Sequence, residues 1–218
     1  HTSFHLNRKS DPSFRTYPRT PVMLVLLRAF LHHGPRRAYV IGLGTGSSAG
    51  WLAAFPGIER VDVAEIEPAI VEVAARAATI NRDALKNPRL HVHLTDAREG
   101  LLTAKQPYDL IVSEPSNPFR VGISSLFTRE YYEAGARRLA AGGLFVQWVQ
   151  AYEIDAETLR SIYATLGSVY PYVETWQSDR NDLVLVASLT PRETTLASLR
   201  RCVSHELMKE ALSKAWYT

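Results

Sequence analysis

The chain has 218 residues, of which 46% are hydrophobic and 22% are charged, a composition typical of a soluble globular protein. This length suits one α/β domain with a sizeable core. The formal net charge of +3 is small, so the composition gives no electrostatic reason to expect a nucleic-acid partner. Cys202 is the single cysteine, which excludes an internal disulfide and favours a reducing compartment.

The most apolar stretch, PVMLVLLRAFL at residues 21–31, does not suit a membrane span. Arg28 interrupts it, and it is shorter than the ~20 residues that a spanning helix needs. The first residues do not resemble a signal peptide. We therefore expect a cytoplasmic protein, or the cytoplasmic domain of a longer, membrane-attached one.

Strands and helices are predicted to alternate after a polar lead-in. Residues 1–20 show no sustained period, and Pro21 opens a largely buried helix that reaches residue 33. Strands are then expected within residues 37–46, 60–67, 90–97, 108–114 and 144–154, and helices within 48–55, 68–80, 128–140 and 155–170. A hairpin of strands at 172–177 and 182–188 and two short tail helices follow. The expected parts are a lead-in with its helix at 1–36, a nucleoside-binding catalytic domain at 37–190 and a helical tail at 191–218.

This alternation predicts an α/β, Rossmann-like fold: a mostly parallel sheet with helices on both faces and a C-terminal antiparallel hairpin. Such sheets bind ligands at the carboxyl ends of their strands, where the strand order reverses. The loops that follow the strands are therefore where a binding site is expected.

The first two predicted strands both end in residues suited to a nucleoside. The first ends in GLGTG, whose Gly42, Gly44 and Gly46 let the backbone turn sharply and approach a ligand closely. The second ends in AEIEP, where Glu65 stands at the offset of an acid that accepts both ribose hydroxyls. Glu67 shares the face of Glu65, so the sequence leaves open which of them binds and which lies at the helix start.

The next two strands add polar groups at the same edge. The third ends in TDA, where Asp96 could accept from an exocyclic amine, cap the following helix, or do both. The fourth ends in SEPSNPF, with Glu114 and Asn117 three residues apart. Four such endings in succession predict a nucleoside-binding crevice.

Several stretches together resemble the spermidine synthase-like proteins, a branch of the class I S-adenosylmethionine-dependent transferases. They are VIGLGTG, VDVAEIEPAIVEVA, LTDAREGL and YDLIVSEPSNPF, joined by VGISSLFTREYY, which is similar to the family's mobile cover segment. SEPSNP and FVQWVQAYE resemble a bacterial subgroup whose domain is often fused to membrane helices. The resemblance covers roughly residues 37–188 and implies the class I methyltransferase fold.

The resemblance also implies roles for single residues. The three glycines and Ser113 would lie against the donor, Glu65 would take the ribose hydroxyls, Ile66 would pack on the adenine, and Asp96 and Ala97 would read its edge. Gln147 matches a glutamine that the family places near the acceptor. Trp148 and Tyr152 follow in the sequence and either wall the acceptor pocket or belong to the core.

This chain departs from the aminopropyl-transferring members at the positions that hold amines. Thr45 stands where they have an aspartate, Glu114 and Asn117 replace Asp-x-x-Asp, and residues 20–22 lack their Tyr-(His/Gln)-Glu. Glu114 could still serve as the base, whereas an asparagine cannot accept a proton at neutral pH. Fewer acids also reduce repulsion of the carboxylate of S-adenosylmethionine, which tilts the donor toward that molecule and the reaction toward methyl transfer.

The sequence thus predicts a transferase that uses S-adenosylmethionine or its decarboxylated form to alkylate an amine-bearing small molecule, with Glu114 and Asn117 as catalytic residues. The missing acids argue against putrescine as the acceptor. A methyltransferase and a non-catalytic nucleoside-binding domain are the alternatives. His91 and His93 share a strand face without further clustered ligands, so no metal is expected. Dimerisation and attachment to membrane helices stay open.

Overall fold

The computed structural model describes residues 5–6, 9–10, 19–32, 34–115, 118, 122–151, 154–179 and 182–216. Its strands are β1 His5–Leu6, β2 Lys9–Ser10, β3 Arg37–Ile41, β4 Arg60–Glu65, β5 Leu90–Leu94, β6 Tyr108–Ser113, β7 Leu139–Gln150, β8 Tyr172–Asp179 and β9 Asp182–Ser188. Its α-helices are α1 Arg19–Leu31, α2 Ser47–Ala53, α3 Pro68–Arg76, α4 Ala78–Asn81, α5 Ala97–Thr103, α6 Arg129–Arg138, α7 Ala156–Gly167, α8 Leu196–Ser204 and α9 Glu206–Trp216. Two short 3₁₀ turns, η2 Ala84–Lys86 and η3 Ser124–Phe127, complete the described elements.

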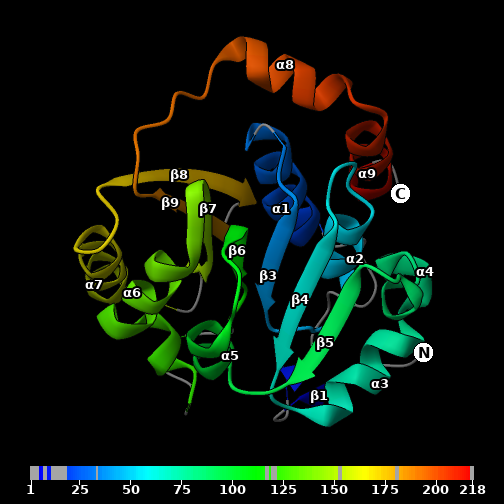
Figure 1. Ribbon diagram of the computed structural model, residues 1–218, viewed down its shortest axis with the longest axis horizontal. Helices are drawn as coiled ribbons and strands as arrows, with labels where there is room; N and C mark the ends of the chain where they lie inside the picture. Colours follow the sequence, from blue (N-terminus) through cyan, green and yellow to red (C-terminus); the bar gives the residue numbers. More distant parts are fainter. Residues whose placement is uncertain are drawn as a thin grey trace.

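The predicted sheet is confirmed. Within the described residues, seven strands pair in the order β5-β4-β3-β6-β7-β9-β8, and β1 pairs only with β2. The strands from β5 to β7 are parallel, whereas β9 is antiparallel to both β7 and β8. The order reverses beside β3, because β4 and β5 lie on one side of it and β6 and β7 on the other (Figure 1).

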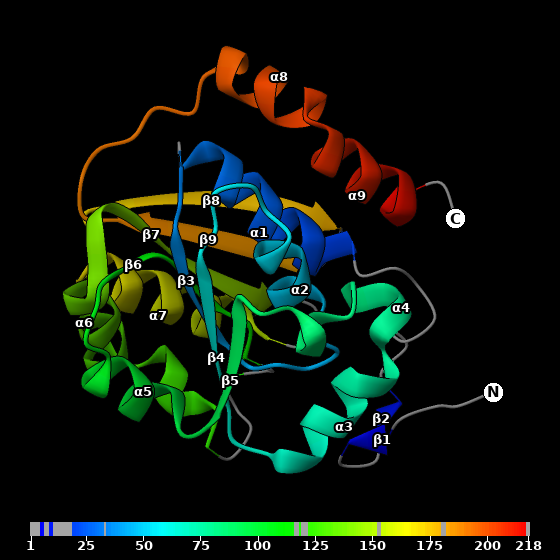
Figure 2. The same cartoon turned by 45° about the vertical axis from the view of Figure 1, so that its right-hand side comes forward.

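Two hydrophobic clusters cover the two faces of this sheet. One unites α1, α2, α8 and α9 with alternate strand residues such as Val40, Val63 and Val112. The other unites α5, α6 and α7 with the intervening residues such as Ile41 and Ile111. Helices α5, α6 and α7 accordingly lie together on one side in Figures 1 and 2, and α8 and α9 cross the other.

The structure differs from the sequence prediction at three places. The helix expected at 68–80 is broken at Ala77 into α3 and α4. The helix expected at 128–140 ends at Arg138, and β7 begins at once because Leu139 pairs with Tyr108 of β6. In the lead-in, where no period was found, β1 and β2 form a two-residue ladder and α1 begins at Arg19.

Helix α1 and the C-terminal helices α8 and α9 contribute to the same core as the sheet. Buried residues of α1, including Val25 and Leu26, belong to the cluster that also holds Cys202 of α8 and Met208 of α9. Cys202 is a buried free thiol that packs in this cluster. The division at residues 36 and 190 stays an expectation. No helix in the described ranges is both long and apolar enough to cross a membrane.

Candidate functional site

The four predicted strand ends lie side by side. Ile41 of β3 is paired with Ala64 of β4 and with Ser113 of β6, and Glu65 is paired with Leu94 of β5. The loops that follow these strands therefore meet at one edge of the sheet, beside the point where the strand order reverses. This is the edge of the sheet at which the sequence predicts a nucleoside-binding site.

The glycine turn has a backbone shape that requires glycine. Gly42, Gly44 and Gly46 have φ angles of 88°, 51° and 77°, in the left-handed region where a Cβ is strained. Gly46 is the N-cap residue of α2. A Cβ on Gly44 would meet no atom within 4 Å, so the turn leaves open space where a ligand can approach the backbone.

Asn81, which sequence reasoning missed, fastens this turn to the rest of the domain. Its buried amide donates to the carbonyl oxygens of Thr45 and Ala74, at 2.8 and 2.7 Å, and its Oδ1 accepts from the N–H of Ala84 at 3.1 Å. The backbone of Asn81 also lies against Gly50 of α2, where an added Cβ would lie 1.9 Å from the Asn81 carbonyl oxygen. No local sequence signal marks this contact, because its partners lie up to 36 residues away.

The structure separates the roles of the two glutamates that the sequence left open. Glu67 is the N-cap of α3, and its side chain accepts from the N–H of Ala69. Glu65 is buried, and its carboxylate accepts from the N–H of Leu43 in the glycine turn and from the N–H of Glu67, each at 2.9 Å. Glu65 is therefore the glutamate that is hydrogen-bonded to the glycine turn, and each of its oxygens retains a lone pair for a further donor.

The predicted adenine side of the crevice combines an exposed apolar side chain with a helix start. Ile66 is 72% exposed, although a side chain of its size is usually buried. Asp96 is the N-cap of α5, as one of the two interpretations expected, and accepts from the Arg98 N–H at 2.8 Å. The Arg98 guanidinium also binds its carboxylate, which lowers the pKa of Asp96. Ala97 follows as the first helical residue, so its N–H has no intrahelical partner.

Glu114 reaches the crevice from the end of β6, and its electrostatic setting is unusual. Its backbone N–H donates to the carbonyl of Ile41, and its Oε1 is fully buried without a hydrogen-bond partner. Burial raises the pKa of Glu114 to about 7, and the Ser48 hydroxyl of α2 lowers it by less. A carboxyl that titrates near neutral pH is suited to proton transfer. Asn117, the predicted catalytic partner of Glu114, lies outside the described residues.

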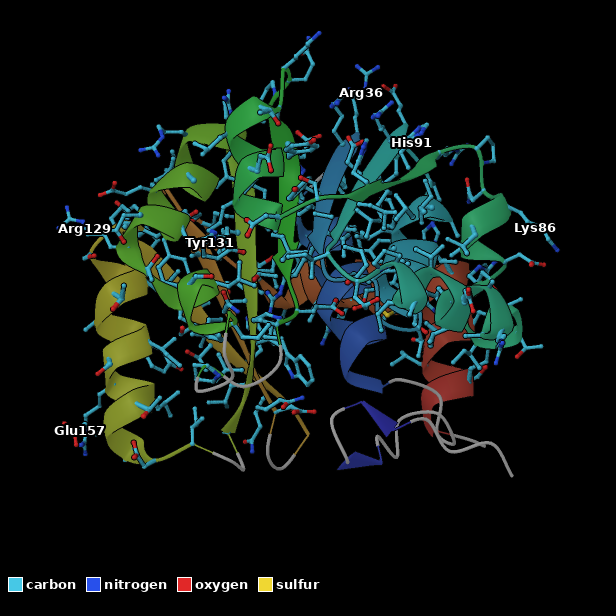
Figure 3. All side chains as sticks on the ribbon, turned by 90° about the horizontal axis from the view of Figure 1, so that it is seen from below. Arg36, Lys86, His91, Arg129, Tyr131 and Glu157 are labelled. Atoms are coloured by element: carbon cyan, nitrogen blue, oxygen red, sulfur yellow. The ribbon has the colours of Figure 1, made fainter. Side chains whose placement is uncertain are left out.

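The remaining predicted residues divide between the two faces of the sheet. Ser113 is fully buried, and its hydroxyl accepts from the Tyr131 hydroxyl at 2.8 Å; Figure 3 shows Tyr131 inside the molecule. Gln147 lies beside Ser113 on β7, fully buried, with its Oε1 unpartnered. Trp148 points to the opposite face and packs against the α1–α2 cluster, which favours the core interpretation. Tyr152 lies outside the described residues.

One of the two histidines, His93, contacts an acidic side chain on the neighbouring strand. His93 Nε2 lies 2.7 Å from Asp62 Oδ1, and Arg60 binds the same carboxylate through two nitrogens. Arg60 and His93 lower the pKa of Asp62 against the effect of burial. In the part of the chain that the structure describes, no group of three or more metal-ligating side chains occurs.

Comparisons with known proteins agree with this geometry. The fold resembles a spermidine synthase crystallised with the transition state analogue AdoDATO, with a TM-score of 0.76 and 18% identity over 91% of this chain and 72% of the other. It also resembles human methyltransferase-like protein 13 in complex with SAH, with a TM-score of 0.67 and 22% identity over 88% and 90% of the two chains. The seven-stranded sheet with its antiparallel hairpin is that of the class I methyltransferase fold.

Sequence similarity identifies one family within this fold class. The family model of the spermine/spermidine synthase domain matches residues 20–178, and the chain belongs to this family. The polyamine aminopropyltransferase of Nitrosomonas europaea is 35% identical over 156 residues, which are 69% of this chain and 48% of that protein. The thermospermine synthase ACAULIS5 of Arabidopsis thaliana is 29% identical over 149 residues, 66% of this chain and 44% of that protein. This chain thus matches just under half the length of these relatives, which are transferases by name.

Proposed function

We propose that this domain transfers the aminopropyl group of decarboxylated S-adenosylmethionine to the amino group of a small-molecule acceptor. Support comes from the family membership and from the names of the relatives, which are polyamine aminopropyltransferases and a thermospermine synthase. The likeness to a methyltransferase lies in the fold alone, at 22% identity, so methyl transfer is the less favoured reaction.

The observation that carries this proposal is Glu114 at the end of β6. An acceptor amine must lose its proton before or during attack, and a base works best when its pKa is near the operating pH. Glu114 has a pKa of about 7 because its carboxyl is buried, and it lies at the edge of the sheet where the glycine turn also ends. Methyl and aminopropyl transfer to an amine both start from a sulfonium donor and both release a proton from the amine. Glu114 therefore supports alkylation of an amine, and the family membership supports the aminopropyl group.

The reaction balances with this one base. The nitrogen lone pair of the acceptor attacks the donor carbon bonded to sulfur, the C–S bond breaks, and its electron pair stays on sulfur as methylthioadenosine leaves. The proton of the acceptor nitrogen passes to Glu114. Glu65 and the glycine turn would hold the ribose, and the Ala97 N–H and Asp96 would face the adenine. Most of the rate enhancement would come from aligning the two reactants in line.

The glycine turn bears on which donor is used. Thr45 carries no charge, and its hydroxyl lies 3.0 Å from the Ser47 hydroxyl. The turn therefore neither attracts the donor's ammonium nor repels the additional carboxylate of S-adenosylmethionine. We expect discrimination between the two donors to be weaker than a turn with an acid would give.

Calorimetric titration with both donors and with methylthioadenosine, together with product analysis on a panel of diamines and monoamines, tests the proposal. Glu114→Gln should bind decarboxylated donor within a few-fold of wild type and lose most transfer activity, by about 10²–10⁴-fold. Glu72→Gln, an exposed glutamate on α3, is the matched control and should change neither. Transfer of methyl instead of aminopropyl would refute the proposed reaction. Binding without transfer of either group would leave the non-catalytic alternative.

Location and assembly belong to the same proposal. We infer that the domain works in the cytoplasm, which agrees with its single cysteine and the reducing compartment that this favours. Tethering to membrane helices in a longer protein and formation of a homodimer stay proposals. Detergent extraction and sedimentation of the protein expressed from its natural gene would test them.

A further inference from the structure

A cavity of about 280 Å³ lies between α1, the middle of β7 and the β8–β9 hairpin. None of the donor-site residues lines it. In Figures 1 and 2 the hairpin lies in the upper half of the molecule, whereas the arrowheads of β4 and β5, at the edge of the sheet where the donor site is proposed, point downward. The cavity is therefore separate from the crevice.

Arg28 places a buried positive charge beside this cavity, and Glu174 is its ion-pair partner among the described residues. The residue is only 2% exposed, and its Nε has no hydrogen-bond partner. The guanidinium lies 4.4 Å from the centre of the Trp176 ring. Its nearest carboxylate oxygen, Glu174 Oε2, is 4.0 Å from Nη1, which is too far for a hydrogen bond. Burial lowers the pKa of Arg28 to about 10, so the side chain remains charged at neutral pH.

Arg192 adds a second guanidinium from the segment after β9. It donates to the backbone carbonyls of Gly142, at 3.0 Å, and Leu31, both of which are neutral. Glu174, the carboxylate among the lining residues, already accepts from the Trp176 indole at 3.2 Å and from the Thr194 hydroxyl at 3.3 Å. Two cations and one anion leave the cavity with one uncompensated positive charge.

Buried charges in proteins are usually paired, and an unpaired guanidinium nitrogen in a cavity is costly without a partner. A bound anion would supply that partner. A single negative charge would bring the lining to neutrality, whereas a phosphate dianion would overshoot it. The rest of the wall combines apolar side chains, from Leu31, Leu144, Pro171, Val173 and Val186, with the polar groups of Tyr172, Ser188 and Thr194.

We propose that this cavity is a binding site for a small aliphatic monocarboxylate, whose carboxylate meets Arg28 and Arg192 and whose alkyl chain lies on the apolar wall. Arg28 carries the recognition, because a guanidinium fork matches a carboxylate geometrically. The ligand class follows from the charge and lining of the cavity and needs neither donor nor acceptor.

Fluorescence of Trp176 reports on the site, because its ring is stacked with Arg28. Butyrate should change the indole emission saturably at millimolar concentrations, and the Trp176→Phe variant should lose that change. Butylamine, with the opposite charge, and inorganic phosphate should give at least tenfold weaker responses. Saturating methylthioadenosine should leave butyrate binding unchanged.

Arg28→Met keeps the length of the side chain without its charge and should weaken butyrate binding at least tenfold. Arg192→Gln, a second variant that is less buried, should weaken it as well. Arg200→Gln, an exposed arginine on α8, is the matched control and should bind like wild type. The proposal would be overturned if both the Arg28 and the Arg192 variant bound butyrate as tightly as wild type does. It would also be overturned if butyrate gave no saturable response, or if phosphate bound more tightly than butyrate.

Discussion

Glu114 should make the stability of this protein depend on pH in a way that a single substitution removes. Its pKa is raised from 4.5 to about 7 in the folded protein, because the carboxyl is buried. A carboxyl whose folded pKa is raised stabilises the fold while it is protonated. The contribution is fully present below the unfolded pKa of 4.5 and is lost as the pH rises through 7.

The size of this effect follows from the two pKa values. A shift of one unit corresponds to about 1.4 kcal/mol, so the full difference is about 3 kcal/mol, of which roughly 2.5 kcal/mol falls between about pH 5 and pH 8. The free energy of unfolding of wild type should therefore fall by about 2–3 kcal/mol more over this range than that of Glu114→Gln. All other titrating groups are common to both proteins, so the comparison isolates Glu114.

Urea unfolding followed by far-UV circular dichroism, at closely spaced pH values across this range, measures the difference. Glu72→Gln, with an exposed carboxyl, should follow the wild-type curve. Parallel curves for wild type and Glu114→Gln would show that the carboxyl is solvated in the folded protein. In that case the reasoning that makes Glu114 a base near neutral pH would fail.

Three further substitutions test how the crevice is held. Gly50→Ala places a Cβ 1.9 Å from the carbonyl of Asn81 and should destabilise the protein by about 1–3 kcal/mol in urea unfolding; an unchanged midpoint would contradict the close approach of α2. Asn81→Ala leaves the carbonyl of Thr45 without its donor and should cost about 1–3 kcal/mol of stability and weaken donor binding in calorimetry. If donor affinity stays at the wild-type value, the amide does not position the turn. Asp96→Ala should abolish detectable donor binding and cost about 1 kcal/mol of stability through the lost helix cap, whereas Asp96→Ser should restore the cap but not the binding. Equal donor affinity of wild type and Asp96→Ala would remove Asp96 from the site.

The sheet, and the edge of it where the candidate site residues gather, were predictable from local patterns. Runs such as YDLIV and RVDVAE predict buried parallel strands. A glycine turn followed by a helix can also be predicted from neighbouring residues alone. The strand ends could be grouped because parallel strands bring their carboxyl ends to one edge. Local patterns did not predict the break of α3 at Ala77 or the start of β7 at Leu139. At Leu139 the reason is that strand pairing with Tyr108 overrides helix propensity.

The sequence by itself determined which residue types meet at the crevice and the fold that brings them together, because both depend on periods of two to four residues. Only the tertiary structure decided that Glu65 faces the glycine turn and Glu67 caps a helix, and that Gln147 and Trp148 point to opposite faces. It also decided that Glu114 titrates near neutral pH, since a pKa depends on burial, which distant segments of the chain create. The burial of Arg28 likewise depends on the tertiary structure. In the sequence Arg28 only interrupts an apolar helix, and its charge is buried because the helix packs against β8.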